Sequence, residues 1–259
     1  MMDMTASHTG ADACQVCGST DRRLYIRHHG MELFECAECG LIYLDPMPSA
    51  AAIDALYADA YDGTTSGYFA KVDSKLRRSR QRIRRLSRTI NATAGPSHSS
   101  RRFLDVGANG GFMVEAARES GWDAGGVELD PASVAYAKNN YPAATFFHGT
   151  IENYLAQGPA PFDFIYCSEV IEHVTDVNAF VRAVASLLCP GGHFYLTTPD
   201  IGHWRRPRDL LQWDGFSPPS HCLYFRAASL KRLLERHGFQ VIKRELAFKP
   251  GIKMLACLR

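Results

Sequence analysis

The chain has 259 residues, of which 46% are apolar and 22% are charged, and its formal net charge is +2. These values are ordinary for a globular protein with one full-sized α/β domain and a small appendage. A net charge near zero gives no overall argument for binding to nucleic acid or to a membrane surface. Residues 1–13 lack the apolar core of a signal peptide, and no apolar run is long enough to span a bilayer. We therefore expect a cytoplasmic protein with no membrane partner.

Four of the eight cysteines follow the spacing of a structural zinc site. They form C-x2-C-x18-C-x2-C, a glycine follows each pair, and the four residues are Cys14, Cys17, Cys36 and Cys39. Glycine allows a tight turn in which two thiolates point at one ion. A disulfide is the weaker alternative in a chain without an export signal. We predict a zinc ribbon over 1–45, with strands at 24–27 and 33–35. Its zinc is not expected to be catalytic, because four thiolates leave no open coordination position.

Residues 46–100 are predicted to form a helical cap and a linker. A short helix is expected at 50–58. From 69 to 90, apolar residues recur at three- and four-residue steps, which predicts an amphipathic helix. The other faces of this helix are strongly basic. They form either a solvated cationic surface or an attractive surface for a phosphate-bearing substrate, such as a nucleotide sugar or RNA. The polar segment 91–100 is the predicted linker.

Residues 101–259 alternate strand and helix patterns in the manner of a doubly wound α/β domain. Pro190-Gly191-Gly192 is expected to end the helix that follows the fourth strand of this domain. Strands are predicted at 102–106, 124–128, 144–147, 162–167, 192–198, 239–247 and 252–258, and helices at 111–120, 131–139, 176–188 and 227–237.

A glycine-rich turn follows the first of these strands, where Asp105, Gly107, Asn109 and Gly111 occupy alternate positions. A helix pattern follows, and Glu128 lies 23 residues after Asp105. Small residues let the backbone approach a ligand, and an acid after the next strand can accept hydrogen bonds from both ribose hydroxyls. Asparagine tolerates the left-handed backbone that such a turn requires. The pattern indicates a nucleoside site, and a tight turn without a ligand is the alternative.

The spacing D-x-G-x-N-x-G resembles motif I of class I S-adenosylmethionine (SAM)-dependent methyltransferases, with Asn109 at the middle glycine. Stretches at 162–167, 187–192, 195–199 and 221–239 resemble, in order and type, the ubiquinone-biosynthesis-like group of that family. The resemblance implies a seven-stranded Rossmann-like sheet and SAM as the cofactor. It places the cofactor-binding residues as Asp105, Gly107, Asn109 and Gly111 around methionine and ribose, Glu128 at the ribose hydroxyls, Leu129 beside the adenine, Thr150 and Ile151 at its edge, and Ser168 after the fourth strand.

The segment Glu169-x-x-Glu172-His173 follows the predicted fourth strand, beside the expected methyl-transfer site. Two carboxylates and an imidazole can bind a divalent cation such as Mg²⁺ or Mn²⁺, which would lower the pKa of a bound hydroxyl. The pattern resembles the metal ligands of ubiquinone-biosynthesis O-methyltransferases and of small-RNA 2′-O-methyltransferases, and this resemblance adds His221. We expect His173, Glu169 and His221 to be catalytic. In the metal-free alternative, Glu169 faces the cofactor, Glu172 pairs locally, and His173 acts as a base or packs at a loop.

The loop 203–220 is rich in Arg and Pro. Its aromatic residues could pack on a sugar or aromatic acceptor, and its arginines could contact an anionic group. The alternative is a surface loop whose tryptophans cover the edge of the core. The residues concerned are Trp204, Trp213, Phe216, Arg205, Arg206 and Arg208.

The leading functional hypothesis is SAM-dependent O-methylation of a small-molecule or saccharide acceptor, with the ribbon and the basic helix covering the site. One alternative is carbon methylation of a nucleotide-linked sugar, because the chain resembles sugar C-methyltransferases in its zinc-ribbon N-terminus. A second is an RNA methyltransferase that binds RNA through the ribbon and the basic helix. A third is a SAM-binding regulator without catalysis, which the intact carboxylates and histidine of the site disfavour.

Overall fold

The computed structural model of the chain describes residues 13–49, 52–53, 69, 71–93 and 101–259. The helix predicted at 50–58 and the linker predicted at 91–100 lie largely outside these residues. Within the described part, no helix combines the length and apolar content needed to cross a bilayer.

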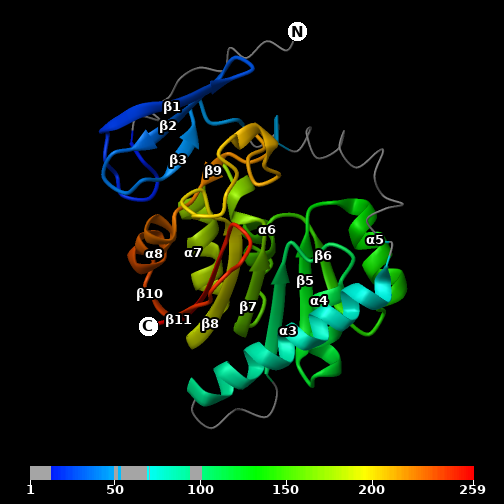
Figure 1. Cartoon of the computed structure of the whole chain (residues 1–259). Coiled ribbons are helices and arrows are strands. Elements are labelled where there is room, and N and C mark those ends of the chain that lie inside the picture. Colours follow the sequence, from blue (N-terminus) through cyan, green and yellow to red (C-terminus); the bar gives the residue numbers. More distant parts are fainter. Residues whose placement is uncertain (1–12, 50–51, 54–68, 70, 94–100) are drawn as a thin grey trace.

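A seven-stranded sheet forms the centre of the molecule, in the order β10-β11-β8-β7-β4-β5-β6. The strands β8, β7, β4, β5 and the edge strand β6 run parallel, and β11 pairs antiparallel with β8. This arrangement confirms the predicted seven-stranded Rossmann-like sheet (Figure 1). The strands are β4 (Arg102–Val106), β5 (Asp123–Glu128), β6 (Thr145–His148), β7 (Phe162–Ser168), β8 (Leu188–Pro199), β10 (Phe239–Arg244) and β11 (Gly251–Leu258).

Helices cover both faces of the sheet, and two separate apolar clusters show which helix lies on which face. On one face, Ile83 and Leu86 of α3 pack with Phe103 and Phe164 of the sheet. On the other face, the buried side of α7 packs against a cluster that extends into the N-terminal module. The first face carries α3 (Val72–Thr93), α4 (Phe112–Glu119) and α5 (Pro131–Asn140), and the second carries α6 (Ile151–Leu155), α7 (Val177–Leu187) and α8 (Ala227–Arg236).

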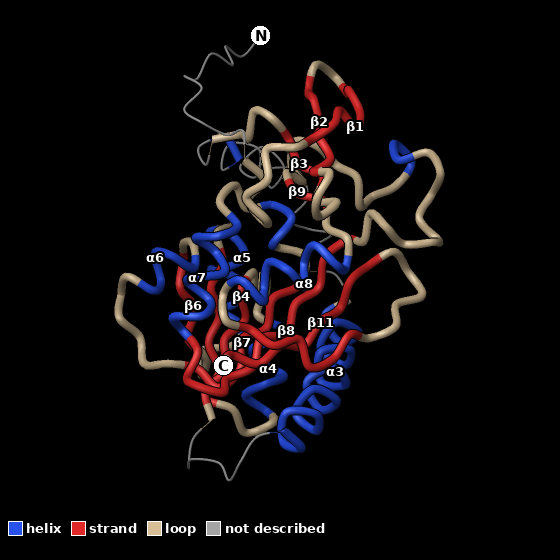
Figure 2. The backbone as a smooth tube through the Cα atoms, turned by 90° about the vertical axis from the view of Figure 1, so that its left-hand side faces the viewer, coloured by secondary structure: helices blue, strands red, loops and turns tan. Residues whose placement is uncertain are grey.

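The cysteine-rich N-terminal module contributes three strands, β1 (Arg22–His28), β2 (Met31–Cys36) and β3 (Ile42–Leu44), to a second sheet. The fourth strand of that sheet is β9 (Leu223–Tyr224), which comes from the C-terminal part of the chain and pairs antiparallel with β3. Figure 2 shows these four strands together above the large sheet. The boundaries 1–45, 46–100 and 101–259 remain predictions, and β9 joins the first and last of these segments in one sheet.

Several elements differ from their predicted ranges because tertiary pairing decides them. The strand predicted at 192–198 begins earlier, at Leu188, so Pro190-Gly191-Gly192 lies inside β8 instead of ending a helix. The register of β7 against β8 shifts at this point, which accommodates the irregular segment. The strands β3 and β9 were not predicted as strands, since two or three residues carry no readable periodicity.

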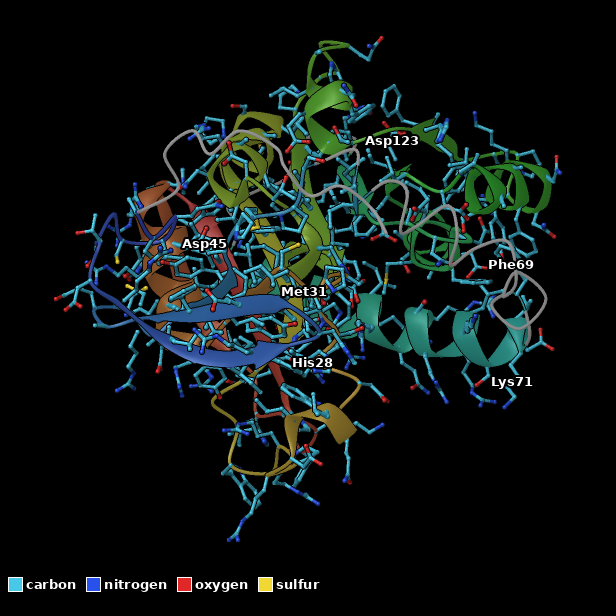
Figure 3. All side chains as sticks on the ribbon, turned by 90° about the horizontal axis from the view of Figure 1, so that it is seen from above. His28, Met31, Asp45, Phe69, Lys71 and Asp123 are labelled. Carbon is cyan, nitrogen blue, oxygen red and sulfur yellow. The ribbon has the colours of Figure 1, made fainter. Side chains whose placement is uncertain are left out.

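The amphipathic helix expected over 69–90 is observed as α3, which crosses one face of the sheet (Figure 1). Its basic surface is partly neutralised, because Arg80 pairs with Glu119 of α4 at 2.6 Å and Arg85 pairs with Glu245 at 2.8 Å. Seen from above, Phe69 and Lys71, which precede α3, lie well apart from the β1–β2 hairpin (Figure 3). The ion pairs of Arg80 and Arg85 weaken the case for α3 as an RNA-binding surface.

Candidate active site

The glycine turn after β4 adopts backbone angles that few side chains tolerate. Gly107 and Gly111 have φ of 77° and 81°, and Asn109 has 49°, the left-handed conformation expected for it. A Cβ on Gly107 would lie 2.4 Å from Val170 Cγ2, so a larger residue cannot be placed there without displacing Val170. Gly107 N donates to Val127 O at 2.9 Å, which ties the turn to β5.

Glu128 ends β5 beside this turn, and its carboxylate organises the surrounding backbone. Oε2 accepts a hydrogen bond from Asn109 N at 2.7 Å, and Oε1 accepts from Leu129 N at 2.8 Å and Asp130 N at 2.9 Å. Each carboxylate oxygen can accept two hydrogen bonds, so Oε2 retains capacity for a ligand hydroxyl. Burial raises the pKa of Glu128, while these backbone N–H groups act in the opposite direction.

Asp105 lies at the buried floor of the same region, with Tyr166 of β7 beside it in the sheet register. Burial, and after it the negative charge of Glu128, raise the pKa of Asp105 well above its usual range. Arg82 of α3 opposes this rise in pKa and donates to the Tyr166 hydroxyl. Helix α3 therefore adds a positive charge that acts on Asp105, besides covering the sheet.

The residues expected near an adenine lie together beside Glu128. Gly149 N donates to Glu128 O at 2.9 Å, which brings the start of α6 next to the end of β5. Thr150 caps α6 by accepting from Asn153 N at 3.2 Å, and Ile151 is buried directly after it. Leu129 follows Glu128 in the adjoining loop. The predicted cofactor residues of this group thus share one corner of the sheet.

Beyond the end of β7, the structure brings together Glu172, His173 and His221. Glu172 and His173 belong to the short helix η1 (Ile171–His173), and His221 precedes β9. One potential ligand atom from each of the three lies within 4.8 Å of the other two. Glu172 Oε1 is 3.9 Å from His173 Nε2, and the imidazole rings are 4.6 Å apart, edge to face.

Backbone carbonyls orient both imidazoles. His173 Nδ1 lies 2.8 Å from Ser220 O, and His221 Nδ1 lies 3.1 Å from Gly215 O. Because a carbonyl only accepts, each Nδ1 carries the proton, and the lone pair of each neutral ring is on Nε2. Burial, with a further contribution from His221, lowers the pKa of His173 to about 4. Burial also lowers the pKa of His221, so both rings are neutral at pH 7.

Glu172 has an acceptor oxygen that the protein leaves unmatched. Its side chain is 1% exposed, and Oε2 accepts from Thr198 Oγ1 at 2.9 Å. Among the described residues, no donor reaches Oε1. Burial, and then the charge of Glu169, raise the pKa of Glu172 to about 8. A buried carboxylate oxygen within 4.8 Å of a potential ligand atom of two imidazoles fits a bound divalent cation, which would remove the cost of burying this group.

Glu169 is the member of the predicted set that stands apart. It has a left-handed φ of 56°, and its Oε1 accepts from Thr197 Oγ1 at 2.7 Å. The same Thr197 hydroxyl lies 2.8 Å from Ser168 Oγ, so Ser168, Glu169 and Thr197 form a polar chain at the ends of β7 and β8. Glu169 therefore influences the Glu172 carboxyl through its charge and is not one of the three converging groups.

The four cysteines of the predicted zinc site also converge. Cys14 Sγ is 3.5 Å from Cys39 Sγ, and Cys17 Sγ is 3.4 Å from Cys36 Sγ. Tetrahedral zinc with bonds of about 2.3 Å sets its sulfurs about 3.8 Å apart, close to these spacings. The hydrogen bond from Cys39 lowers the pKa of Cys14 to about 5, which favours a thiolate. The geometry is thus compatible with a structural zinc ribbon.

The cysteine module is attached to the segment that carries the three converging side chains. Gln15, between two of the cysteines, donates to Thr175 O at 2.8 Å and accepts from Val177 N at 2.9 Å, just after η1. Leu44 N donates to Cys222 O at 3.0 Å, and Cys222 N donates to Glu172 O at 2.8 Å. The N-terminal module therefore supports Glu172 and His221 from outside the large sheet.

The aromatic residues of the loop 203–220 have different environments. Phe216 is buried and packs on Tyr224 with ring centroids 5.0 Å apart, and Trp213 packs partly buried against the same cluster. Trp204 is 82% exposed. Trp213 and Phe216 thus cover the core, and only Trp204 is open to solvent.

Sequence reasoning missed the groups that hold the site in place. Thr197 and Thr198 bind the two glutamates, while Ser220 and Gly215 orient the imidazoles. The two threonines lie in the 195–199 stretch that resembles the methyltransferase family, so their position beside the site could have been predicted from that motif. The two carbonyls had no signal, because every residue has one.

A glycine turn, an acid at the end of β5 and a polar cluster at the carboxyl ends of parallel strands define a class I SAM-dependent methyltransferase. The chain belongs to the methyltransferase domain family, whose model matches residues 78–244.

The ubiquinone biosynthesis O-methyltransferase of Proteus mirabilis (strain HI4320) is 35% identical over 103 residues, which are 38% of this chain and 42% of that protein. The protein of the same description from Xylella fastidiosa (strain M23) is 39% identical over 106 residues, covering 39% and 43%. The chain thus spans less than half the length of these curated relatives. The structure of magnesium protoporphyrin IX methyltransferase of Synechocystis PCC 6803, solved with S-adenosylhomocysteine, is similar to this chain with a TM-score of 0.57. The match covers 79% of this chain and 99% of that one, and at 15% identity it shows a likeness of fold alone.

Proposed function

We propose that this protein transfers a methyl group from SAM to a hydroxyl oxygen of a small-molecule acceptor, at a site that holds a divalent metal ion. The observation that carries the proposal is the buried Glu172 Oε1, which has no donor among the described residues, lies 3.9 Å from His173 Nε2 and belongs to a cluster of three potential ligand groups with His173 and His221. The O-methyltransferase description of the relatives supports an oxygen acceptor.

The chain's own groups would bind the cofactor from the sheet edge. The Glu128 carboxylate is placed to accept from a ribose hydroxyl, and Gly107 lets the turn beside it pack closely against Val170. SAM supplies the sulfonium methyl group, so the protein's task is to position the acceptor and exclude water. The aromatic cover formed by Phe216 and Tyr224 contributes to that exclusion.

The metal ion, when bound, lowers the pKa of a coordinated acceptor hydroxyl. Glu172, His173 and His221 would hold it, since both histidines have their lone pair on Nε2 and a cation would displace the proton from the Glu172 carboxyl. Two imidazoles favour a first-row transition metal over Mg²⁺. With a pKa of about 4, His173 is a poor general base, which favours its role as a ligand over the metal-free alternative. The four-cysteine cluster would hold a separate structural zinc ion.

The test compares metal content with cofactor binding in three proteins. Wild type, Glu172→Gln and Glu169→Gln are purified with added Mn²⁺, and bound metals are counted by mass spectrometry. We expect zinc in all three, and one further ion in wild type and in Glu169→Gln that Glu172→Gln lacks. S-adenosylhomocysteine should bind all three in calorimetry, and methyl transfer to hydroxylated acceptors should fall at least about 100-fold in Glu172→Gln. Equal metal content in wild type and Glu172→Gln would contradict the metal site, and failure of wild type to bind S-adenosylhomocysteine would contradict the activity.

A further inference from the structure

A separate cavity of about 340 Å³ opens where the chain leaves β8 and where α8 begins. Its lining is unusual in charge, since three arginines and a histidine face it and no carboxylate is among its described lining residues. The residues that form its wall include Gly202, His203, Trp204, Arg206, Arg208 and Arg226. A volume of this size lies within the range of small-molecule sites and exceeds the needs of a single inorganic ion.

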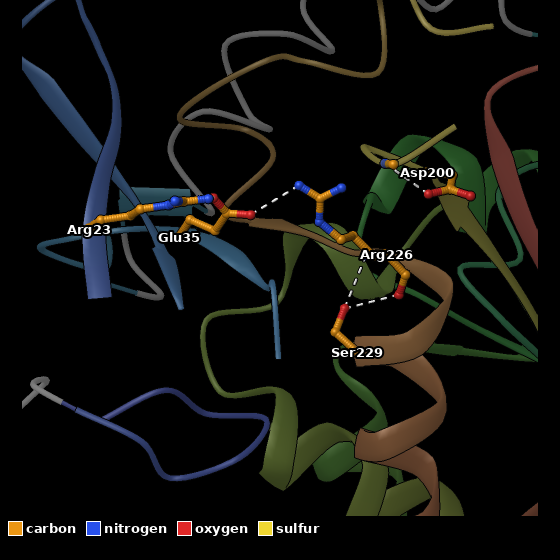
Figure 4. A network of polar contacts seen from close by, with 6 residues as sticks. Arg23, Glu35, Asp200, Arg226 and Ser229 are labelled. Carbon is orange, nitrogen blue, oxygen red and sulfur yellow. Dashed lines mark hydrogen bonds and ion pairs between the residues drawn. The ribbon is translucent and has the colours of Figure 1, made fainter. Parts of the chain in front are cut away.

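The acids near this cavity are already matched, and Glu35 offsets the charge of Arg226 in the cavity wall. Glu35 of β2 accepts from Arg226 at 3.0 Å and also pairs with Arg23 at 2.7 Å, as Figure 4 shows. Asp200 accepts from Gly202 N at 2.9 Å and lies 3.6 Å from Arg244.

Arg206 and Arg208 are not neutralised in this way. In the described part of the chain, no carboxylate lies within ion-pair distance of either guanidinium. Within the described ranges, the one acceptor of Arg206 is the carbonyl of Pro207, at 3.2 Å from Nη1, and a neutral carbonyl leaves the charge of the guanidinium uncompensated. The cavity therefore carries a net positive charge and suits an anion.

Glycine at position 202 keeps the cavity open. A Cβ there would lie 3.2 Å from Arg226 Nη1 and 3.3 Å from Asp200 Oδ1, so a side chain would press on the guanidinium. Guanidinium groups bind phosphate oxygens through paired N–H donors, and several of them around one cavity match a phosphate or diphosphate better than a single carboxylate.

The cavity is also close to the expected methyl-transfer site along the chain. Arg226 follows His221 by five residues, through β9, and a chain of that length spans at most about 18 Å. Gly202 follows Thr198, which binds Glu172, by only four residues. A phosphorylated acceptor of moderate length can therefore reach both places.

We propose that this cavity binds the phosphate or diphosphate group of the methyl acceptor, an inference that rests on the proposed function. The acceptor class is then a phosphorylated or nucleoside-diphosphate-linked hydroxyl compound, whose charged end lies at Arg206 and Arg208 while its hydroxyl lies at the metal ligands. Binding at the cavity itself involves no covalent step.

The binding test uses the full zinc-loaded chain, with inorganic pyrophosphate and uridine diphosphate as calorimetric probes. We expect saturable binding that weakens about tenfold in Arg206→Gln and again in the double variant with Arg208→Gln, since one charge-assisted contact corresponds to roughly that factor. Arg205→Gln is the matched control, because Arg205 lies over the Trp204 ring and does not line the cavity. It should change the affinity less than twofold. Absence of saturable binding, or equal weakening by Arg205→Gln, would overturn the proposal.

Two further readouts separate the proposals from each other. S-adenosylhomocysteine should bind wild type and the arginine variants equally. If it binds and pyrophosphate does not, only the phosphate site is lost, whereas failure of S-adenosylhomocysteine to bind removes the proposed function itself. With acceptor pairs that differ by one phosphate, only the phosphorylated member should be methylated efficiently, and pyrophosphate should raise its KM. If pyrophosphate instead changes kcat equally for both members, the cavity binds a separate effector and the acceptor assignment is wrong.

Discussion

Glu172 should make the stability of the metal-free protein fall as the pH rises. Its pKa is raised from 4.5 to about 8, mainly by burial and then by Glu169. Above pH 4.5 the unfolded chain has lost this proton, whereas the folded chain keeps it up to about pH 8. The folded state therefore binds more protons, and its free energy of unfolding decreases with pH over this window.

The magnitude follows from the shift. A tenfold change in proton affinity corresponds to about 1.4 kcal/mol, so the full window corresponds to at most about 5 kcal/mol. His173 has the opposite effect, because its pKa is lowered to about 4. The unfolded chain binds a proton at this residue below pH 6.5 and the folded chain does not, so the free energy of unfolding decreases as the pH falls from 6.5. Between pH 6.5 and 8 the folded His173 is neutral and the unfolded one loses its remaining charge, so its contribution is small. Over the same range Glu172 should contribute a decrease of about 2 kcal/mol to the free energy of unfolding. Asp105, whose pKa is also raised, contributes equally to wild type and to variants at Glu172, so the difference between them isolates Glu172.

Urea unfolding from pH 6.5 to 8 measures this slope. The protein is treated with a weak chelator that leaves four-thiolate zinc bound, and metal analysis verifies this. Glu172→Gln keeps the shape and an acceptor for Thr198 but removes the titrating group, so its stability should fall by about 2 kcal/mol less than that of wild type between pH 6.5 and 8. Glu169→Gln should reduce the slope of stability against pH by half at most, since burial remains the main cause of the raised pKa of Glu172. A wild-type slope that persists unchanged in Glu172→Gln would refute the assignment.

Three other outcomes are expected. Gly107→Ala should abolish binding of S-adenosylhomocysteine in calorimetry and lower the free energy of unfolding by at least about 2 kcal/mol, because its Cβ would overlap Val170. Adding Val170→Ala should recover part of the stability, and unchanged binding in Gly107→Ala would contradict the predicted overlap with Val170. Glu128→Gln should weaken the same ligand at least about tenfold but leave the affinity of its 2′,3′-dideoxy analogue nearly unchanged, and equal loss for both would exclude a ribose contact. Gln15→Ala should lower the midpoint of thermal unfolding by several degrees without changing zinc content, because two partly buried hydrogen bonds between the cysteine module and the η1–α7 segment are lost. An unchanged midpoint would show that these bonds do not couple the module to the site.

The long elements of this protein were predictable because their periodicity is local. The strand at 102–106 and the helix at 131–139 were found within one residue of β4 and α5, and each has turn or capping residues at its ends. Asp130, for example, caps α5 by accepting from Ser133 N at 2.7 Å, which is a signal confined to adjacent residues. The glycine turn and Glu128 were readable for the same reason.

The grouping of distant side chains was not readable in that way. The segment Glu169-x-x-Glu172-His173 contains two glutamates whose roles cannot be told apart from the sequence. In the structure Glu169 has a left-handed backbone and binds Thr197, whereas Glu172 converges with His221. That choice depends on packing between β7, β8 and the loop before β9. The sequence by itself determined the class of fold, the cofactor turn and the four-cysteine cluster, because these follow from short-range spacing. Only the tertiary structure decided that β9 completes the sheet of the cysteine module, which glutamate faces the histidines, and where arginines gather around a cavity, because each of these depends on contacts between residues far apart in the chain.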